Sequence, residues 1–223
     1  MSKTFDIDMY DGHLIFIVDG MKVLVDTGSP VTIGGRNPFM FMEEEYGCHA
    51  TLDINGISQL MNYDIDVLMG MDIIKRYYVQ TDYKHRQITF SKEPLSVEQM
   101  AATPLIRGDM GEVCINLTVK DNTIKLALDT GAKISYIDSA YTEGENRIGI
   151  KDDFNPITGH FKTPIFDMEV SIGYSHFPVK FGVLPPLLGM PLQMMGIYGA
   201  IGFDFFNAFT VVMDFKENNL YIR

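Results

Sequence analysis

The sequence predicts an all-β protein built from two similar halves. Short runs of β-branched and aromatic residues, bounded by turn-forming residues, dominate the chain, and Phe209 to Val212 is one example. Two sequence patterns occur twice in the same order, which indicates an internal duplication. At 223 residues, with 46% of them hydrophobic, the chain is long enough for two small domains that each have a packed core.

The first pattern is the triplet Asp-Thr-Gly, at positions 26–28 and 129–131. From average residue usage, one such triplet arises by chance in roughly one chain of this length in twenty. Each follows an apolar strand predicted to end a hairpin, whose turn lies at Asp19-Gly20 or at Asp121-Asn122. A single triplet would more often be a structural turn in which Asp bonds nearby backbone, but its repetition favours a functional site.

The second pattern, two apolar residues followed by Gly-x-Asp, occurs at positions 68–72 and 200–204. Its final residues, Asp72 and Asp204, are predicted to be the N-caps of short helices. Ten residues later each half has another aspartate, Asp82 or Asp214, where a further hairpin is predicted to turn. The order of motifs is therefore the same in both halves.

The spacing of the motifs locates an insertion in the second half. The triplets are 103 positions apart and the glycine motifs are 132 positions apart, so the second half carries 29 additional residues. The predicted domains are residues 1–92 and 112–223. Residues 93–111, which contain Pro94, Pro104 and Gly108, are predicted to connect them.

Charge and composition exclude several classes of partner. The chain has 18 Lys and Arg residues against 29 Asp and Glu residues, and this net charge of -11 opposes binding to nucleic acid. No apolar run is long enough to span a bilayer, so no membrane partner is expected. The five histidines have no metal-ligand spacing, and no metal site is predicted. We expect a cytoplasmic protein, or an exported one if a signal segment has been removed.

An apolar strand leading into Asp-Thr-Gly, then a glycine motif and a short helix, resembles the aspartic peptidases. Retropepsins use two identical chains of about half this length, and pepsins use one longer chain. This sequence is similar to two retropepsin-like lobes fused in one chain. The resemblance implies a bilobal acid-protease β-barrel fold with one short helix per lobe, acting as a monomer without a cofactor.

The resemblance also implies an aspartic endopeptidase whose catalytic residues are Asp26 and Asp129. Two carboxyl groups that share a site have one pKa strongly raised, so one can act as base while the other acts as acid. The pair would activate a water molecule that attacks a peptide bond of an extended polypeptide. The residues implied to support the pair are Thr27, Gly28, Ser29, Thr130 and Gly131.

Among these residues, Thr27 and Thr130 are implied to bond the opposite loop through their hydroxyl groups. The halves differ at the residue that directly follows each triplet, where Ser29 corresponds to Ala132. A Ser29 hydroxyl that donates to Asp26 would favour the ionised form of Asp26. We therefore hypothesise that Asp26 is ionised and that Asp129 carries the shared proton.

The insertion predicts a single flap, in the second half, whereas pepsins carry theirs on the N-terminal lobe. Turn formers lie at the centre of residues 155–161, and the usual pepsin flap tyrosine is not evident. The Met-rich stretch from Leu187 to Gly199 is expected to be a surface loop. The flap residues predicted to contact substrate are Phe154, Ile157, Thr158, Gly159, His160 and Phe161.

The resemblance further predicts a sheet built from chain ends, using Thr4 to Met9, Thr103 to Ile106 and Leu220 to Ile222.

Two other functions remain open. The chain could be a module that binds extended peptides without cutting them, or a peptidase that acts only on one dedicated partner.

Overall fold

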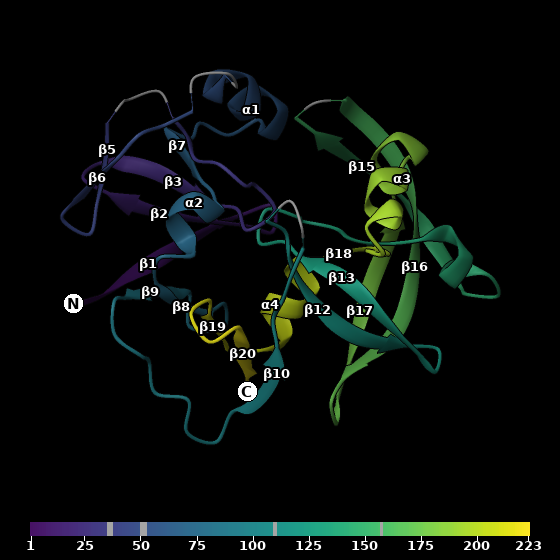
Figure 1. The fold of residues 1–223 in the computed structure, drawn as a ribbon. Helices are drawn as coiled ribbons and strands as arrows, with labels where there is room; N and C mark the ends of the chain where they lie inside the picture. Colours follow the sequence, from purple (N-terminus) through teal and green to yellow (C-terminus); the bar gives the residue numbers. More distant parts are fainter. Residues whose placement is uncertain (35–37, 50–52, 109–110, 157) are drawn as a thin grey trace.

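The computed structural model describes the chain except for residues 35–37, 50–52, 109–110 and 157. β-strands dominate, which confirms the all-β prediction. Residues 1–92 are here called the N-terminal half and residues 112–223 the C-terminal half. Figure 1 shows most elements of each half grouped together, whereas the last two strands of the chain lie with the N-terminal group. Within the described part of the chain, no helix has the length and apolar character needed to cross a membrane.

The elements of the N-terminal half are β1 (Ser2–Tyr10), β2 (His13–Val18), β3 (Met21–Val25), β4 (Ile33–Gly34), β5 (Phe39–Phe41), β6 (Glu44–Tyr46), α1 (Ile54–Met61), β7 (Val67–Met69), α2 (Met71–Ile74), β8 (Tyr78–Asp82) and β9 (Gln87–Ser91). The connector contains β10 (Ala101–Pro104) and β11 (Ile106–Arg107). The C-terminal half contains β12 (Val113–Val119), β13 (Asn122–Leu128), β14 (Ser135–Ile137), the 3-10 helix η1 (Ser139–Thr142), β15 (Arg147–Asn155), β16 (Gly159–Ile172), β17 (Ser175–Val183), α3 (Pro186–Met194), β18 (Gly199–Ile201), α4 (Phe203–Ala208), β19 (Val211–Asp214) and β20 (Asn219–Ile222).

The predicted hairpins before the triplets are present in both halves, as β2–β3 and β12–β13. Their turns have positive φ at both central residues, Asp19 and Gly20 in one and Lys120 and Asp121 in the other. Such turns match the natural twist of the paired strands. The second turn lies one residue earlier than predicted. In each half the strand before the triplet then pairs in parallel with the strand before the glycine motif, β3 with β7 and β13 with β18.

The helices after the glycine motifs are α2 and α4, but their N-caps are Gly70 and Gly202. The prediction that Asp72 and Asp204 are the caps was therefore wrong, because each helix begins one residue before its aspartate. Close backbone packing explains the glycine. A Cβ atom on Gly70 would lie 2.3 Å from the carbonyl oxygen of Val31.

The predicted chain-end sheet is confirmed. One sheet has the order β10-β20-β19-β8-β9-β1-β2-β3-β7-β4, and it contains all three predicted segments except Leu105, which lies between strands, and Ile106, which begins β11. Pairing of β8 with β19, with Thr81 opposite Val211, carries this sheet from one half into the other. The two halves are therefore joined by backbone hydrogen bonds as well as by side chains.

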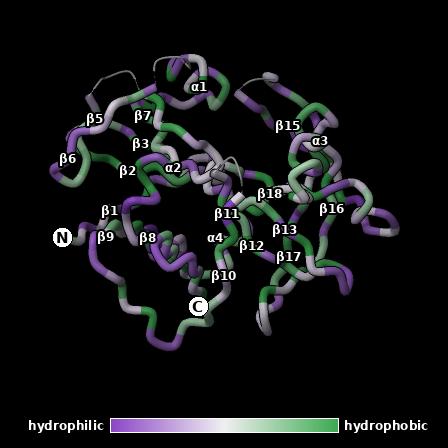
Figure 2. Tube along the Cα trace, viewed as in Figure 1, coloured by the Kyte–Doolittle hydropathy of each residue, from purple (hydrophilic) through white to green (hydrophobic). Residues whose placement is uncertain are grey.

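The C-terminal half has a second sheet, of order β11-β12-β13-β18-β14-β17-β16-β15. Figure 2 shows hydrophobic residues along its central strands and hydrophilic residues recurring at the outer turns. Two α-helices, and the short 3-10 helix η1, were not predicted. Helix α1 follows the N-cap Asp53, and α3 occupies the stretch that was expected to be a loop, with Leu187 and Met194 exposed.

Candidate active site

The two triplets meet where the halves join. Asp26 and Asp129 directly follow β3 and β13, and their N–H groups extend the parallel pairing by donating to Met69 (3.0 Å) and Ile201 (2.9 Å). The side chains of the two aspartates are hydrogen-bonded to each other. The fold therefore brings together the two residues that the sequence singled out, although they are 103 positions apart.

The threonines of the triplets hold the two loops together through reciprocal hydrogen bonds. Each backbone N–H donates to the opposite hydroxyl oxygen, from Thr27 to Thr130 and from Thr130 to Thr27, both at 3.0 Å. The hydroxyl groups donate onward to carbonyl oxygens of the opposite strands, Thr27 to Leu128 (2.7 Å) and Thr130 to Val25 (2.8 Å). Both side chains are buried. Every polar atom of this contact is satisfied, which fixes the two loops relative to each other.

The glycines of the triplets each serve both carboxyl groups. The N–H of Gly28 donates to Oδ1 of Asp26 (2.8 Å), and the N–H of Gly131 donates to Oδ1 of Asp129 (2.9 Å). A Cβ atom on Gly28 would lie 2.6 Å from Cγ of Asp129, and one on Gly131 would lie 2.6 Å from Cγ of Asp26. Any side chain at either glycine would therefore displace the opposing carboxyl group.

Burial raises the pKa of both carboxyl groups. For Asp26 the second cause is the charge of Asp129, and together they place its pKa well above the usual range. The pKa of Asp129 is also raised by burial, against hydrogen bonds from the Gly131 N–H and from Asp26 that lower it. Two adjacent carboxyl groups of this kind titrate as a pair and hold one shared proton.

The expected role of Ser29 was wrong. Its hydroxyl group donates to the carbonyl oxygen of Val31 (2.8 Å), so its single proton is not directed at Asp26. Only the backbone N–H of Ser29 contacts that carboxyl, at 3.0 Å from Oδ1. The hypothesis that Asp26 is the ionised partner therefore loses the side-chain contact on which it rested.

A cavity of about 420 Å³ lies against the two carboxyl groups, which is within the usual range for ligand sites. Its lining is mostly apolar on the side of the N-terminal half, where α1 contributes Ile57 and Met61. The other apolar lining residues come from the N-terminal half (Leu24, Pro30, Ile33, Leu68), the flap (Phe154, Pro156, Phe161) and the C-terminal half (Ala132, Leu184, Leu188, Leu192, Ala200).

The predicted flap is present in the C-terminal half as the hairpin β15–β16, in which Asn155 is opposite Gly159. Phe154 lines the cavity and packs on the hydrophobic cluster of the N-terminal half that contains Ile57 and Met61. The flap therefore spans the cavity from one half to the other. Phe161 also lines the cavity.

The other predicted flap residues have different positions. Thr158 lies in the hairpin turn, where its N–H donates to Oδ1 of Asn155 (3.3 Å), and Gly159 has a φ of 78°. His160 packs beside Phe154, with ring centroids 6.1 Å apart. Thr158, Gly159 and His160 are not among the described residues that line the cavity, and Ile157 lies outside the described residues.

Sequence reasoning missed polar residues that line the cavity beside the dyad. They are His13, Lys133, Tyr136 and Asp153. A signal for Lys133 and Tyr136 was available, since they lie four and seven positions after Asp129. Helix α1 was also recognisable, because Asp53 precedes apolar residues at helical spacing.

No protein-family model matches this sequence, and no curated protein matches it. Among solved structures, the chain is similar to a retropepsin-like aspartic protease from Rickettsia conorii, with 20% identity and a TM-score of 0.40. That similarity covers 58% of this chain and 95% of the other chain. The functional class proposed below rests on the contacts of the two Asp-Thr-Gly loops.

Proposed function

We propose that this chain is an aspartic endopeptidase in which Asp26 and Asp129 form the catalytic dyad. Residues 1–92 and 112–223 would be its two retropepsin-like lobes, with residues 93–111 as the connector, and one chain would contain the whole site. The observation that carries the proposal is the pair of partly buried, hydrogen-bonded carboxyl groups held by the reciprocal contact of Thr27 and Thr130.

In this mechanism the dyad holds one water molecule and one shared proton. The ionised carboxylate removes a proton from the water while the protonated carboxyl donates a hydrogen bond to the carbonyl oxygen of the scissile peptide bond. The water oxygen bonds to the carbonyl carbon while the carbonyl oxygen takes the proton of the protonated carboxyl, which gives a tetrahedral diol. As the C–N bond breaks, the proton taken from water passes to the leaving nitrogen, and one diol hydroxyl returns its proton to the other carboxylate.

The substrate would be a polypeptide with apolar side chains near the scissile bond, and the lining of the cavity supports this. Apolar residues from α1, α3 and the flap surround the dyad, and such surfaces stabilise buried apolar side chains. The flap is a hairpin, whose backbone could pair with an extended peptide as with an added strand.

The direct test is digestion of a diverse peptide library at several pH values. We expect cleavage by the parent protein and a loss of at least roughly a thousandfold in Asp26→Asn and in Asp129→Asn, because either change removes the acid–base pair. Asp152→Asn, which alters an exposed flap carboxylate, is the matched control and should cleave as the parent does.

Two results would contradict the proposal. Peptide binding without cleavage at any pH would favour the non-cleaving module. Cleavage that survives in both dyad variants would place the chemistry elsewhere.

A further inference from the structure

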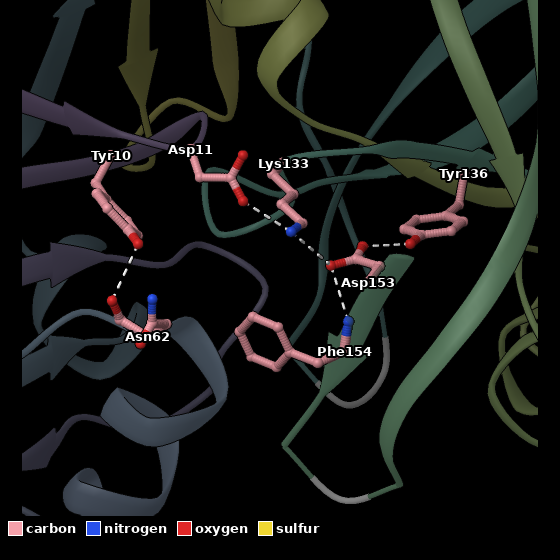
Figure 3. Close-up of polar contacts among 7 residues, drawn as sticks. All are labelled: Tyr10, Asp11, Asn62, Lys133, Tyr136, Asp153 and Phe154. Carbon is pink, nitrogen blue, oxygen red and sulfur yellow. Dashed lines mark hydrogen bonds and ion pairs between the residues drawn. The ribbon is translucent and has the colours of Figure 1, made fainter. Parts of the chain in front are cut away.

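A network of polar side chains connects the flap to the loop that carries Asp129 (Figure 3). The hydroxyl of Tyr136, in β14, donates to Oδ2 of Asp153, in the flap strand β15. The N–H of Phe154 donates to Oδ1 of Asp153 at 2.9 Å. The ammonium nitrogen of Lys133 lies 3.8 Å from Oδ1 of Asp153 and 2.8 Å from Oδ2 of Asp11, in the turn between β1 and β2.

Asp153 is the buried centre of this network. Its side chain is 8% exposed and that of Lys133 is 19% exposed, whereas that of Asp11 is 62% exposed. A buried carboxylate is costly unless it is paired and hydrogen-bonded, and removing its partners is strongly destabilising. Neighbouring flap residues such as Ile150 face solvent. Asp153 is therefore a buried, hydrogen-bonded residue in a strand whose first six residues are exposed.

The network lies beside the catalytic dyad. Burial is the main cause of the raised pKa of Asp129, and the charge of Asp153 raises that pKa further. The ammonium nitrogen of Lys133 lies 3.8 Å from Oδ1 of Asp153, and a positive charge there acts in the opposite sense to that carboxylate.

Two other titratable groups face the same region. Burial and then the charge of Lys133 lower the pKa of His13, so its imidazole is neutral near pH 7. Burial and then the charge of Asp129 raise the pKa of Tyr83, so its hydroxyl is also neutral. Among the groups of this network, the charged ones are therefore Asp153, Lys133 and Asp11.

The residues that hold Asp153 have no counterpart in the N-terminal half. The positions that correspond to Lys133 and Tyr136 are Pro30 and Ile33, which also line the cavity but have no charged or hydroxyl group. The contacts of Lys133 and Tyr136 with Asp153 lie within the half that bears the flap, and Asp11 is the residue of the network that the other half contributes.

We propose that Asp153 is a positioning residue that couples the flap to the dyad, because it fixes the flap strand to Tyr136 and Lys133 and places a third carboxylate beside Asp129. In an active enzyme this coupling would close the flap over substrate and maintain the shared proton toward higher pH. That part of the inference rests on the proposed peptidase function, whereas the coupling itself can be measured without cleavage.

The test compares the parent with four variants. Asp153→Asn removes the charge at nearly constant shape. Tyr136→Phe removes one donor to Asp153 and keeps the charge. Lys133→Met removes the positive charge, and Asp152→Asn is the control, since its side chain lies one residue earlier in the flap strand and is 76% exposed.

Two measurements report on the coupling. Amide hydrogen exchange in β15 and β16 reports how firmly the flap is held. A carbon-13 NMR titration of the Asp26 and Asp129 carboxyl carbons reports the pH at which the dyad loses its shared proton. We expect faster flap exchange in Asp153→Asn and in Tyr136→Phe, by roughly tenfold, but not in Asp152→Asn.

The titration should separate electrostatics from packing. Asp153→Asn should move loss of the shared proton to lower pH, and Lys133→Met should move it to higher pH, while Tyr136→Phe should leave it in place. In an active enzyme, the basic limb of the pH profile of kcat/KM should move in the same directions. KM should also rise roughly tenfold in Asp153→Asn, with a smaller fall in kcat.

The inference is overturned if Asp153→Asn matches the Asp152→Asn control in both flap exchange and dyad titration. It is also overturned if Asp153→Asn and Lys133→Met shift the titration of the dyad in the same direction. Loosened packing alone would produce the same shift in both variants, whereas removal of opposite charges would not. If Asp153→Asn does not fold, Tyr136→Phe and Lys133→Met decide the outcome. A parent that cleaves no peptide would contradict the proposed function and leave these two measurements valid.

Discussion

The two Asp-Thr-Gly loops have the same backbone geometry but different surroundings. Thr27 and Thr130 exchange equal hydrogen bonds, and a Cβ atom on either glycine would lie 2.6 Å from Cγ of the opposing carboxyl group. The side chains that follow the triplets differ, and Pro30 corresponds to Lys133. Placing two carboxyl groups side by side requires symmetric backbone contacts. A polypeptide substrate is asymmetric, so the residues that line the cavity can differ between the two halves.

The largest expected effect comes from breaking the symmetric contact. Thr27→Val and Thr130→Val each remove a hydroxyl that donates one buried hydrogen bond and accepts another. We expect each to lower the free energy of unfolding by about 3 kcal/mol, as measured by urea denaturation. Because the contact is reciprocal, the double variant should cost clearly less than the sum of the two. Additive or very unequal losses would contradict the equivalence of the loops.

Next in size is the effect of a side chain at the glycines. Gly28→Ala and Gly131→Ala each place a Cβ atom against the opposing carboxyl group. We expect kcat/KM to fall roughly a hundredfold in both, because the dyad is displaced. The two values should be similar, and normal activity in either variant would show that the carboxyl groups are not held as described.

A smaller effect concerns stability and pH. A carboxyl group whose pKa is raised on folding stabilises the protein below its unfolded pKa, and this contribution is lost as pH rises through its folded pKa. Asp26→Asn has no such loss. The melting temperature of the variant minus that of the parent should therefore increase from acidic to neutral pH. A constant difference across that range, measured by calorimetry, would show that folding does not raise the pKa of Asp26.

The smallest effect is expected at Ser29, where the halves differ. Because its hydroxyl donates to Val31, Ser29→Ala should cost about 1 kcal/mol of stability and leave the acid limb of the kcat/KM profile unmoved. A shifted acid limb would restore the idea that this hydroxyl stabilises ionised Asp26. The reverse change, Ala132→Ser, is the matched comparison in the other half.

Much of the framework could be predicted because it depends on local pattern and repetition. The triplets, the hairpins before them and the single flap all follow from motif spacing and turn residues. The chain-end sheet followed from the resemblance. These features depend on short stretches of sequence. The triplets and the hairpins also occur twice, so each copy could be compared with the other.

The features that were missed or wrong depend on contacts between distant segments. Ser29 has two acceptors within reach in principle, and only the fold shows that Val31 receives the proton. Asp72 looked like an N-cap, but tight packing around Gly70 starts the helix earlier. The network of Asp153 joins four separate elements, and no local pattern marks an aspartate in a flap as buried.

The most direct test of the central claim is the pH profile of kcat/KM for one cleaved peptide, in the parent and in the two dyad variants. We expect a bell-shaped profile in the parent, because one carboxyl group must be protonated and the other ionised. This profile should disappear in both Asp26→Asn and Asp129→Asn. Activity that persists with an unchanged profile in either variant would contradict the claim that these two aspartates work as a pair.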